Sequence, residues 1–515
     1  MEERSKNSIA RATLAAVGFF IQIAWIIFEV YKISDYYPVA DGLARLVAII
    51  VVLRIYGRHT NAAIKIPWMV FLLVFPIAGM ILYLLFSSKG SRYFTKKKFR
   101  SIIGNLNHNF KKDDDVLEKL KNTDMSKYGQ SYYLSKTGGY PSYEGCHIEY
   151  YAEASDGIEA QKEELKKAKN FIFMEYHAIE DSISFREVED ILEEKAKQGV
   201  DVRVFYDDMG SIGFIGKSFR DRLNKKGIRC SVFNPMVPLL NVFMNNRDHR
   251  KITVIDGKVG FTGGYNLADR YFNIDSPYGH WKDTGIKIVG KAVDSLTVIF
   301  LEMWYAVNHE DMEKEKVSDF INITDEVFDE PGIVQPYAEN PLTEELLAEN
   351  VYMNIAKNAK KYLYIMTPYL LIDDNMNEEL VSAAKRGVDV RIITPGIPDK
   401  KFVYNMTRSY YGALVRGGVR IYEYTPGFVH AKQHIADCEV AAVGTINMDY
   451  RSLYLHFENG ALIHGKNVKA IKDIEKDFLE SFAVSEEVTE KYSASNRSTS
   501  MRIGQCLLRF FAPLL

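Results

Sequence analysis

The sequence predicts an α/β protein in which two similar mixed-sheet units follow an N-terminal hydrophobic helical region. Three observations support this prediction: uncharged apolar runs lie in the first ninety residues, short apolar strands alternate with charged helices from about residue 140, and the same ordered segments recur roughly 190 residues later. At 515 residues the chain is too long for one ordinary core, which also favours several units.

The composition is that of a folded protein, with 47% hydrophobic and 26% charged residues. The formal net charge is -2, so the chain as a whole is not a basic nucleic-acid binder. Its four cysteines are far apart and form no CxxC pair, which argues against a structural zinc site and a disulfide framework and fits a reducing compartment. They are Cys146, Cys230, Cys438 and Cys506.

The hydrophobic region, residues 1–90, contains uncharged runs at residues 12–28 and 66–88. As one helix the second run would be roughly 35 Å long, enough to cross a hydrocarbon core of ~30 Å. A third apolar stretch, residues 46–53, is short and bounded by Arg45 and Arg54. We therefore expect two or three membrane helices, with a signal peptide or a buried core helix as the alternatives.

Basic residues directly after the last apolar run predict the side of the membrane on which the rest of the chain lies. By the positive-inside rule they place the following domains in the cytoplasm of a multi-pass cell-membrane protein. Pro76 and Gly79 could kink the last apolar run or make it interfacial, so the number of spans and the side of the N-terminus stay open. The basic residues are Arg92, Lys96, Lys97, Lys98 and Arg100.

The recurring segments keep their order, at offsets that run from 191 to 175 residues. Residues 168–175, 196–204, 227–229 and 285–291 of the first copy match residues 359–366, 384–392, 418–420 and 460–466 of the second. We expect a linker at 91–139, a first domain at 140–325, a second at 326–495 and an amphipathic tail at 496–515 that either contacts lipid or packs on its own domain.

Each copy contains the pattern H-x-K-x4-D, followed by a glycine segment that ends in asparagine. Strand alternation puts the His and the Lys on one face, and Asp256-Gly257 is a hairpin turn signal that returns the chain beside the histidine strand. A single match would be weak evidence, but two matches at equivalent repeat positions are specific. The residues are His249, Lys251, Asp256 and Asn266 in copy one and His430, Lys432, Asp437 and Asn447 in copy two.

This set of side chains suits a phosphodiester. The lysines can pair with the anion, and the asparagine amides can donate to its non-bridging oxygens. Two histidines permit a double displacement, in which one attacks phosphorus and the other protonates the leaving alkoxide and then deprotonates the incoming hydroxyl. A metal site is not expected, because Lys is a poor ligand and no carboxylate cluster adjoins the histidines in the sequence.

The two motifs resemble the paired HKD motifs of the phospholipase D superfamily, and from about residue 140 onward the details are similar to its bacterial cardiolipin synthases. The points of similarity in copy one are Glu175-Tyr176, Tyr206-Asp-Asp-x-Gly210-Ser211, Asn246-x-x-His249-Arg-Lys251 and Trp281-x-Asp283. Those in copy two are Thr367-Pro368-Tyr369, Asn447-x-Asp449-x-Arg451-Ser452 and Phe457-Glu458, and the apolar run ending at residues 82–86 also fits.

The resemblance implies two phospholipase D-like domains that condense two phosphatidylglycerol molecules to cardiolipin and glycerol, through a phosphatidyl-histidine intermediate and without a cofactor. It implies that His249 is the nucleophile and His430 the acid and base, although the residues alone permit the reverse. It further implies that Asp256 and Asp437 orient the histidines, and that a phosphate cradle is formed by Lys251, Lys432, Asn266 and Asn447. The partners expected are phosphatidylglycerol and anionic membrane lipid, with no nucleic acid.

Three other functions compete with this prediction. A hydrolytic phospholipase D or another head-group exchanger would use the same residues, since water and glycerol-type hydroxyls compete for one intermediate. A nuclease would use the same motifs, but the membrane-like runs and the near-neutral charge argue against it. A non-enzymatic membrane scaffold is difficult to reconcile with two intact motifs.

Overall fold

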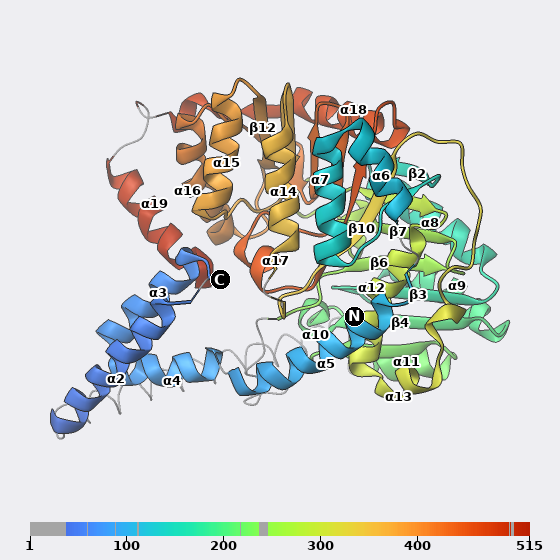
Figure 1. Ribbon diagram of the computed structural model, residues 1–515, viewed down its shortest axis with the longest axis horizontal. Helices are drawn as coiled ribbons and strands as arrows, with labels where there is room; N and C mark the ends of the chain where they lie inside the picture. The colour runs from blue at the N-terminus through green and yellow to red at the C-terminus, as the bar shows by residue number, and fades with distance from the viewer. Residues whose placement is uncertain are drawn as a thin grey trace.

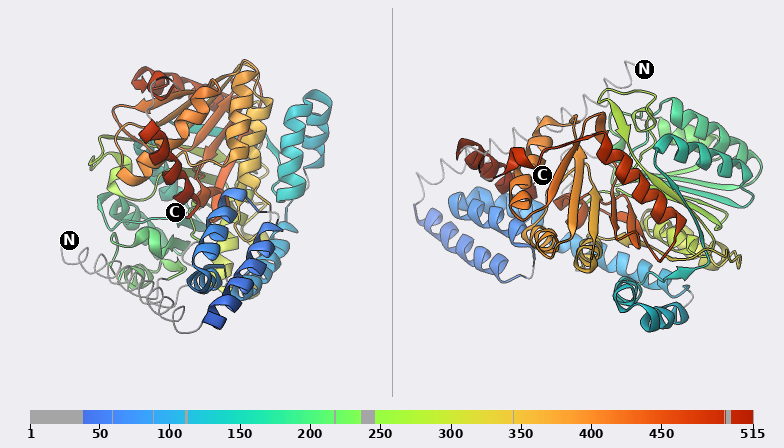
Figure 2. Two further views of the ribbon diagram at one scale, coloured as in Figure 1. Left: turned by 90° about the vertical axis from the view of Figure 1, so that its left-hand side faces the viewer. Right: turned by 90° about the horizontal axis from the view of Figure 1, so that it is seen from above.

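The computed structural model describes residues 38–58, 60–87, 89–110, 113–216, 218–235, 246–343, 345–493, 495 and 499–514. Two large mixed sheets flanked by helices form the body of the molecule, and a group of N-terminal helices extends from one end of it (Figure 1). The first sheet and the second lie beside each other, the first drawn in green and the second in orange to red (Figure 2).

The first sheet has seven strands in the order β2-β9-β7-β6-β3-β4-β5. Strands β3, β4 and β5 are parallel and are connected through helices, whereas the other pairs are antiparallel, so the sheet is mixed as predicted. Its strands are β2 (His147–Tyr151), β3 (Phe171–Tyr176), β4 (Asp201–Asp207), β5 (Arg229–Phe233), β6 (Lys251–Ile255), β7 (Val259–Gly263) and β9 (Gly285–Val289).

The second sheet repeats this topology, since β10-β17-β16-β15-β11-β12-β13 has the same order and the same parallel pairs. This agreement confirms the predicted duplication. Two further strands, β1 and β18, extend its edges. Strand β1 (Tyr143–Glu144) pairs with β10 although the two are distant in the sequence. The strands are β10 (Ile333–Glu339), β11 (Tyr362–Met366), β12 (Asp389–Pro395), β13 (Arg420–Tyr424), β15 (Gln433–Ala436), β16 (Val440–Gly444), β17 (Glu458–His464) and β18 (Ser485–Glu487).

Helix α12 (Val293–Val307) joins the two halves. It is apolar and buried along almost its whole length, and it packs on β5 and β6 of the first sheet and on β10 of the second. Its residues therefore belong to a hydrophobic core that is continuous between the halves. The other main helices are α8 (Ala154–Lys167), α9 (Ile183–Lys197), α11 (Phe219–Lys225), α14 (Leu347–Asn358), α15 (Asp374–Lys385), α16 (Lys401–Arg416) and α18 (Lys469–Ala483).

The uncharged run at residues 66–88 does not form one helix. It is divided between α3 (Ala62–Val74) and α4 (Pro76–Ser87), because Pro76 has no backbone N–H and begins a new helix after Phe75, whose backbone is not helical. Within the described residues, every helix is too short or too polar to cross a bilayer. The stretch at 46–53 lies in α2 (Pro38–Tyr56), and the run at 12–28 lies outside the described residues.

The predicted linker and the C-terminal tail are helical. The segment between the N-terminal region and the first sheet folds into α5 (Lys89–Asn107), α6 (Asp114–Thr123), α7 (Met125–Tyr133) and η1 (Leu134–Gly138), and α5 packs on α12. In the tail, α19 (Thr499–Phe511) contacts both α16 of the second half and α3 of the N-terminal region (Figure 1). The tail thus connects the N-terminal helices with the body of the molecule.

Candidate active site

Each predicted histidine lies just before a central strand of its sheet, on a segment that bonds to the opposite half. His249 precedes β6, and its backbone N–H donates to the carbonyl oxygen of Phe457 at 2.8 Å. His430 precedes β15, and its backbone N–H donates to the carbonyl oxygen of Lys282 at 2.7 Å. Because both bonds cross between the halves, the two histidine segments are held at the same interface.

The histidine side chains also cross between the halves. His249 Nδ1 lies 2.7 Å from a carboxylate oxygen of Glu458, and His430 Nδ1 lies 2.6 Å from a carboxylate oxygen of Asp283. Both carboxylates are fully buried, and Thr445 donates a further hydrogen bond to Glu458 at 2.6 Å. A carboxylate is an acceptor, so each Nδ1 carries the proton and each Nε2 is left with a lone pair.

The surroundings keep both imidazoles neutral. Burial, followed by the ammonium groups of Lys251 and Lys432, lowers the pKa of His249 well below its usual value. Burial and Lys432 lower the pKa of His430 to about 4, although Asp283 acts in the opposite direction. A bound phosphodiester anion would favour protonation of one ring, so the pair can supply both a neutral nucleophile and an acid.

The two lysines are buried and lie beside the histidines. Lys251 Nζ donates to the carbonyl oxygen of His249 at 2.6 Å, and Lys432 Nζ donates to that of His430. Burial lowers the pKa of Lys251 to about 8 and that of Lys432 to about 7, against the attraction of Glu458 and Asp283. The two ammonium groups therefore form a desolvated cationic site that an anion would stabilise.

The two predicted asparagines are both buried, but their amides differ. Asn266 accepts from the backbone N–H of Ala178 at 3.0 Å and donates to the hydroxyl of Tyr271 at 2.8 Å, so its amide is already engaged. Among the described residues, Asn447 Oδ1 has no hydrogen-bond partner. This free Oδ1 is an acceptor, so it can receive a hydrogen bond from a hydroxyl but cannot donate to a phosphoryl oxygen, whereas the Asn266 amide supports the site wall.

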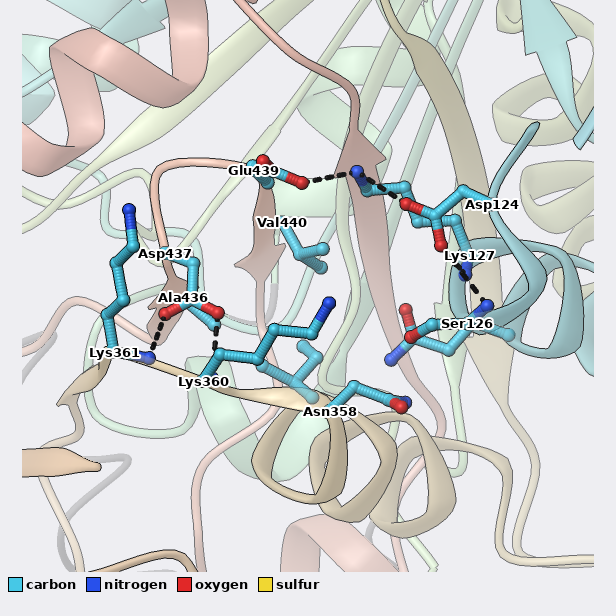
Figure 3. A pocket seen from close by; sticks show the side chains of 12 residues that line it. Asp124, Ser126, Lys127, Asn358, Lys360, Lys361, Ala436, Asp437, Glu439 and Val440 are labelled. Carbon is cyan, nitrogen blue, oxygen red and sulfur yellow. Dashed lines mark hydrogen bonds and ion pairs between the residues drawn. The ribbon is translucent and has the colours of Figure 1, made fainter. Parts of the chain in front are cut away.

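Asp256 and Asp437 lie at the opposite ends of their strands from the histidines, so the prediction that they orient the imidazoles is wrong. Asp437 accepts from the backbone N–H groups of Lys360, Lys361 and Tyr362 at 2.7–3.0 Å, where it lines a small polar cavity of about 100 Å³ (Figure 3). Asp256 accepts at 2.7–2.9 Å from the equivalent three N–H groups at the start of β3. Both carboxylates therefore hold the backbone at the start of a neighbouring strand, β3 for Asp256 and β11 for Asp437.

The orienting carboxylates were visible in the sequence, but as points of similarity without a role. Asp283 and Glu458 each stand two residues before the matched glycines Gly285 and Gly460, so they are equivalent positions of the repeat. The sequence gives no signal that each carboxylate serves the histidine of the other copy. The crossing follows only from the pairing of the halves in three dimensions.

Different rings surround the two histidines. His249 lies 4.8 Å from the ring of His177 and 5.7 Å from that of His456. His430 lies among aromatic rings instead, with centroid distances of 5.1 Å to Tyr271, 5.4 Å to Trp281 and 6.1 Å to Phe428. The site is therefore polar beside His249 and aromatic beside His430. Sequence reasoning gave no role to His177 or His456.

One group of described side chains, His249, His456 and Glu458, has ligand atoms within 4.8 Å of one another and could in geometry hold a metal ion. Glu458 already accepts from His249 and Thr445, and His456 accepts from Arg451 at 3.1 Å. The nearby cations, Lys251 and Arg451, oppose binding of a divalent ion by repulsion. Chemistry without a metal stays the prediction.

The sequence matches a family described as "Cardiolipin synthase, PLD-like domain" over residues 162–304 and 352–482. Residues 44–87 match a "Phospholipase_D-nuclease N-terminal" region. Both histidine segments fall within the first pair of ranges, one in each.

Individual relatives extend this similarity over most of the chain. An uncharacterized protein from Streptococcus mutans is 41% identical, covering 90% of this chain and 99% of that protein. A cardiolipin synthase from Halalkalibacterium halodurans is 32% identical, covering 90% of this chain and 91% of that protein. The crystal structure of a phosphatidylserine synthase from Haemophilus influenzae has the same fold, with a TM-score of 0.53, 16% identity and coverage of 71% of this chain and 93% of that one.

Proposed function

This chain belongs to the phospholipase D-like cardiolipin synthase family, and on that basis we propose that it transfers a phosphatidyl group from one phosphatidylglycerol to another, giving cardiolipin and glycerol. The observation that carries the proposal is the pair of buried histidines held by carboxylates from opposite halves, with two buried lysines beside them. One copy alone would provide a nucleophile without its acid.

In the first step, Nε2 of one histidine attacks the phosphorus of phosphatidylglycerol. An N–P bond forms, the bond between phosphorus and the glycerol oxygen breaks, and the departing glycerol oxygen takes a proton from Nε2 of the other histidine. Glu458 and Asp283 stabilise the positive charge on the rings, because each accepts a hydrogen bond from Nδ1.

In the second step, a hydroxyl of another phosphatidylglycerol gives its proton to the histidine that acted as the acid. Its oxygen attacks phosphorus, the N–P bond breaks, and cardiolipin leaves. Lys251 and Lys432 hold the charge of the phosphoryl oxygens through both steps, and Nδ2 of Asn447, the donor atom of its amide, donates a hydrogen bond to one of them. His249 as nucleophile and His430 as acid and base is the assignment we propose by resemblance.

The N-terminal helices suit a lipid environment. Large apolar side chains on α2 and α3 are exposed, as far as 77% for Val39 and 65% for Leu53. We propose that these helices, together with residues 1–37, insert in the cell membrane and keep the catalytic halves on its cytoplasmic side near anionic lipid. Carbonate extraction of membranes should leave the chain in the pellet, and protease added to intact cells should spare the catalytic halves.

Lipid mass spectrometry after incubation of the purified full chain with phosphatidylglycerol tests the reaction. We expect cardiolipin and free glycerol in equal amounts from the wild type, and neither product from His249→Ala or His430→Ala. His309→Ala is the matched control, because this histidine is exposed on the surface helix α13 (His309–Lys314). Phosphatidic acid as the main product would support hydrolysis instead, and cardiolipin formation by both site variants would refute the assignment.

A further inference from the structure

The two catalytic halves differ at equivalent positions beside the histidines. Trp281 and His456 each stand two residues before the orienting carboxylate of their copy, Asp283 or Glu458. The same repeat position thus supplies an indole beside His430 and an imidazole beside His249. The two sides of the site therefore offer different groups to a substrate, and the polar side is the one beside His249.

The guanidinium of Arg451 lies beside His456 on the polar side of the site. Arg451 belongs to α17 (Tyr450–Tyr454), and its Nε donates to Nε2 of His456 at 3.1 Å. The His456 ring is in turn 5.7 Å from that of His249, so a single imidazole separates the Arg451 guanidinium from the reacting histidine. Arg451 is partly exposed, whereas His456 is buried.

A second arginine bonds to the same segment through its backbone: the N–H of His456 donates to the carbonyl oxygen of Arg451 at 2.9 Å, and the N–H of Phe457 donates to that of Arg247 at 2.8 Å. Arg247 is buried, donates to the carbonyl oxygen of Asn234 at 3.2 Å and lies 3.6 Å from a carboxylate oxygen of Asp207. Burial and the charge of Arg247 both lower the pKa of Arg451, with Asp449 and Asp207 acting in the opposite direction. Two arginines held together in a largely desolvated place are suited to an anion, and Arg presents the planar donor fork that fits a phosphodiester.

The proposed reaction needs such a place. Donor and acceptor phosphatidylglycerol each carry a phosphodiester, and the lysine cradle can hold only the one that reacts. In cardiolipin the second phosphate is joined to the first through a three-carbon glycerol, so the phosphodiester of the acceptor must lie a short distance from the one that reacts. We propose that Arg451, supported by Arg247, binds the phosphodiester of the acceptor phosphatidylglycerol, an inference that rests on the proposed function.

Comparing two reactions of the same enzyme distinguishes binding of the acceptor phosphodiester from a structural or catalytic role that every reaction of the site would need. Condensation uses an acceptor that carries a phosphate, whereas exchange of deuterated glycerol into phosphatidylglycerol runs through the same phosphatidyl-enzyme with an acceptor that has none. For Arg451→Gln we expect kcat/KM of condensation to fall about ten- to hundredfold, mainly through KM, and glycerol exchange to stay within about threefold of the wild type. Arg451→Lys should recover part of the loss, since it keeps the charge but not the fork.

Arg270→Gln is the matched control, because Arg270 occupies the equivalent position of the first copy and lies over the ring of Phe214, 4.7 Å from its centroid. It should leave both reactions unchanged. Equal loss of condensation and exchange in Arg451→Gln would overturn the proposal, and so would no loss of either. Failure of the proposed function would look different, since the wild type itself would then make no cardiolipin.

Discussion

The charge on Glu458 should matter to catalysis more than its shape does. Glu458→Gln keeps the size of the side chain and an oxygen that can still accept from His249 at 2.7 Å and from Thr445 at 2.6 Å, but it removes the negative charge. A hydrogen bond to a charged partner contributes about 1.5–3 kcal/mol. If that stabilisation is expressed when His249 becomes cationic, kcat should fall roughly ten- to 150-fold.

Initial rates of cardiolipin formation, measured with the thermal unfolding midpoint of each variant, check this expectation. Asp283→Asn should cause a loss of similar size, because Asp283 holds His430 in the equivalent geometry at 2.6 Å. Glu310→Gln is the control, since Glu310 is a highly exposed carboxylate on α13. A folded Glu458→Gln variant with the wild-type kcat would refute the idea that the crossed carboxylates stabilise cationic histidine.

Three further outcomes follow from the structure. Asp437→Ala should lower the free energy of unfolding by about 1–3 kcal/mol in denaturant titrations, because the carboxylate binds three backbone N–H groups. The kcat per folded molecule should stay within about threefold of the wild type, because these groups lie far from the histidines. A large loss of kcat without loss of stability would contradict this. In the free enzyme kcat/KM should fall as the pH rises through about 7 to 8, because Lys432 and Lys251, with pKa values lowered to about 7 and about 8, are charged below that range and neutral above it. Lys432→Arg should move this fall to higher pH. A pH profile that is unchanged by the substitution would count against a cationic cradle. Gly210→Ala should impair both folding and activity, because its Cβ would lie 2.2 Å from the carbonyl oxygen of His177 and 2.7 Å from its ring; normal stability and rate in that variant would show that this packing is not needed.

The duplication and the hairpins could be predicted from the sequence because they depend on local patterns. Period-two alternation and the turn signal Asp256-Gly257 predicted the hairpin of β6 and β7. The matched segments of the second copy predicted the same hairpin for β15 and β16, and both pairs are antiparallel in the structure. The similarity of the two sheet orders follows from the conserved order of those segments.

The roles of Asp256 and Asp437 were mispredicted although the predicted strand itself argued against them. Seven positions along an extended chain span roughly 20 Å, so a carboxylate at the end of the motif cannot reach its own histidine. The actual partners, Glu458 and Asp283, lie 209 and 147 residues from the histidines they bind. Such long-range pairs depend on how the halves dock, which no local pattern encodes.

The apolar run at residues 66–88 does not form one continuous helix, and Pro76 is the reason. An apolar run without charge predicts a continuous helix, but Pro76 interrupts the run, and the Cβ that Gly79 lacks would lie only 3.0 Å from Leu72 Cα. The close approach of α4 to α3 therefore depends on that glycine and turns the chain back. Hydrophobicity alone carried no information about this turn.

In the proposed reaction, two histidines from opposite halves form a single catalytic site. Rapid acid or base quenching of the full chain during turnover of phosphatidylglycerol, followed by intact-mass measurement and peptide mapping, tests it most directly. We expect at most one phosphatidyl group per chain, attached to either His249 or His430 and always to the same one. Two groups per chain, or a group on any other residue, would contradict it.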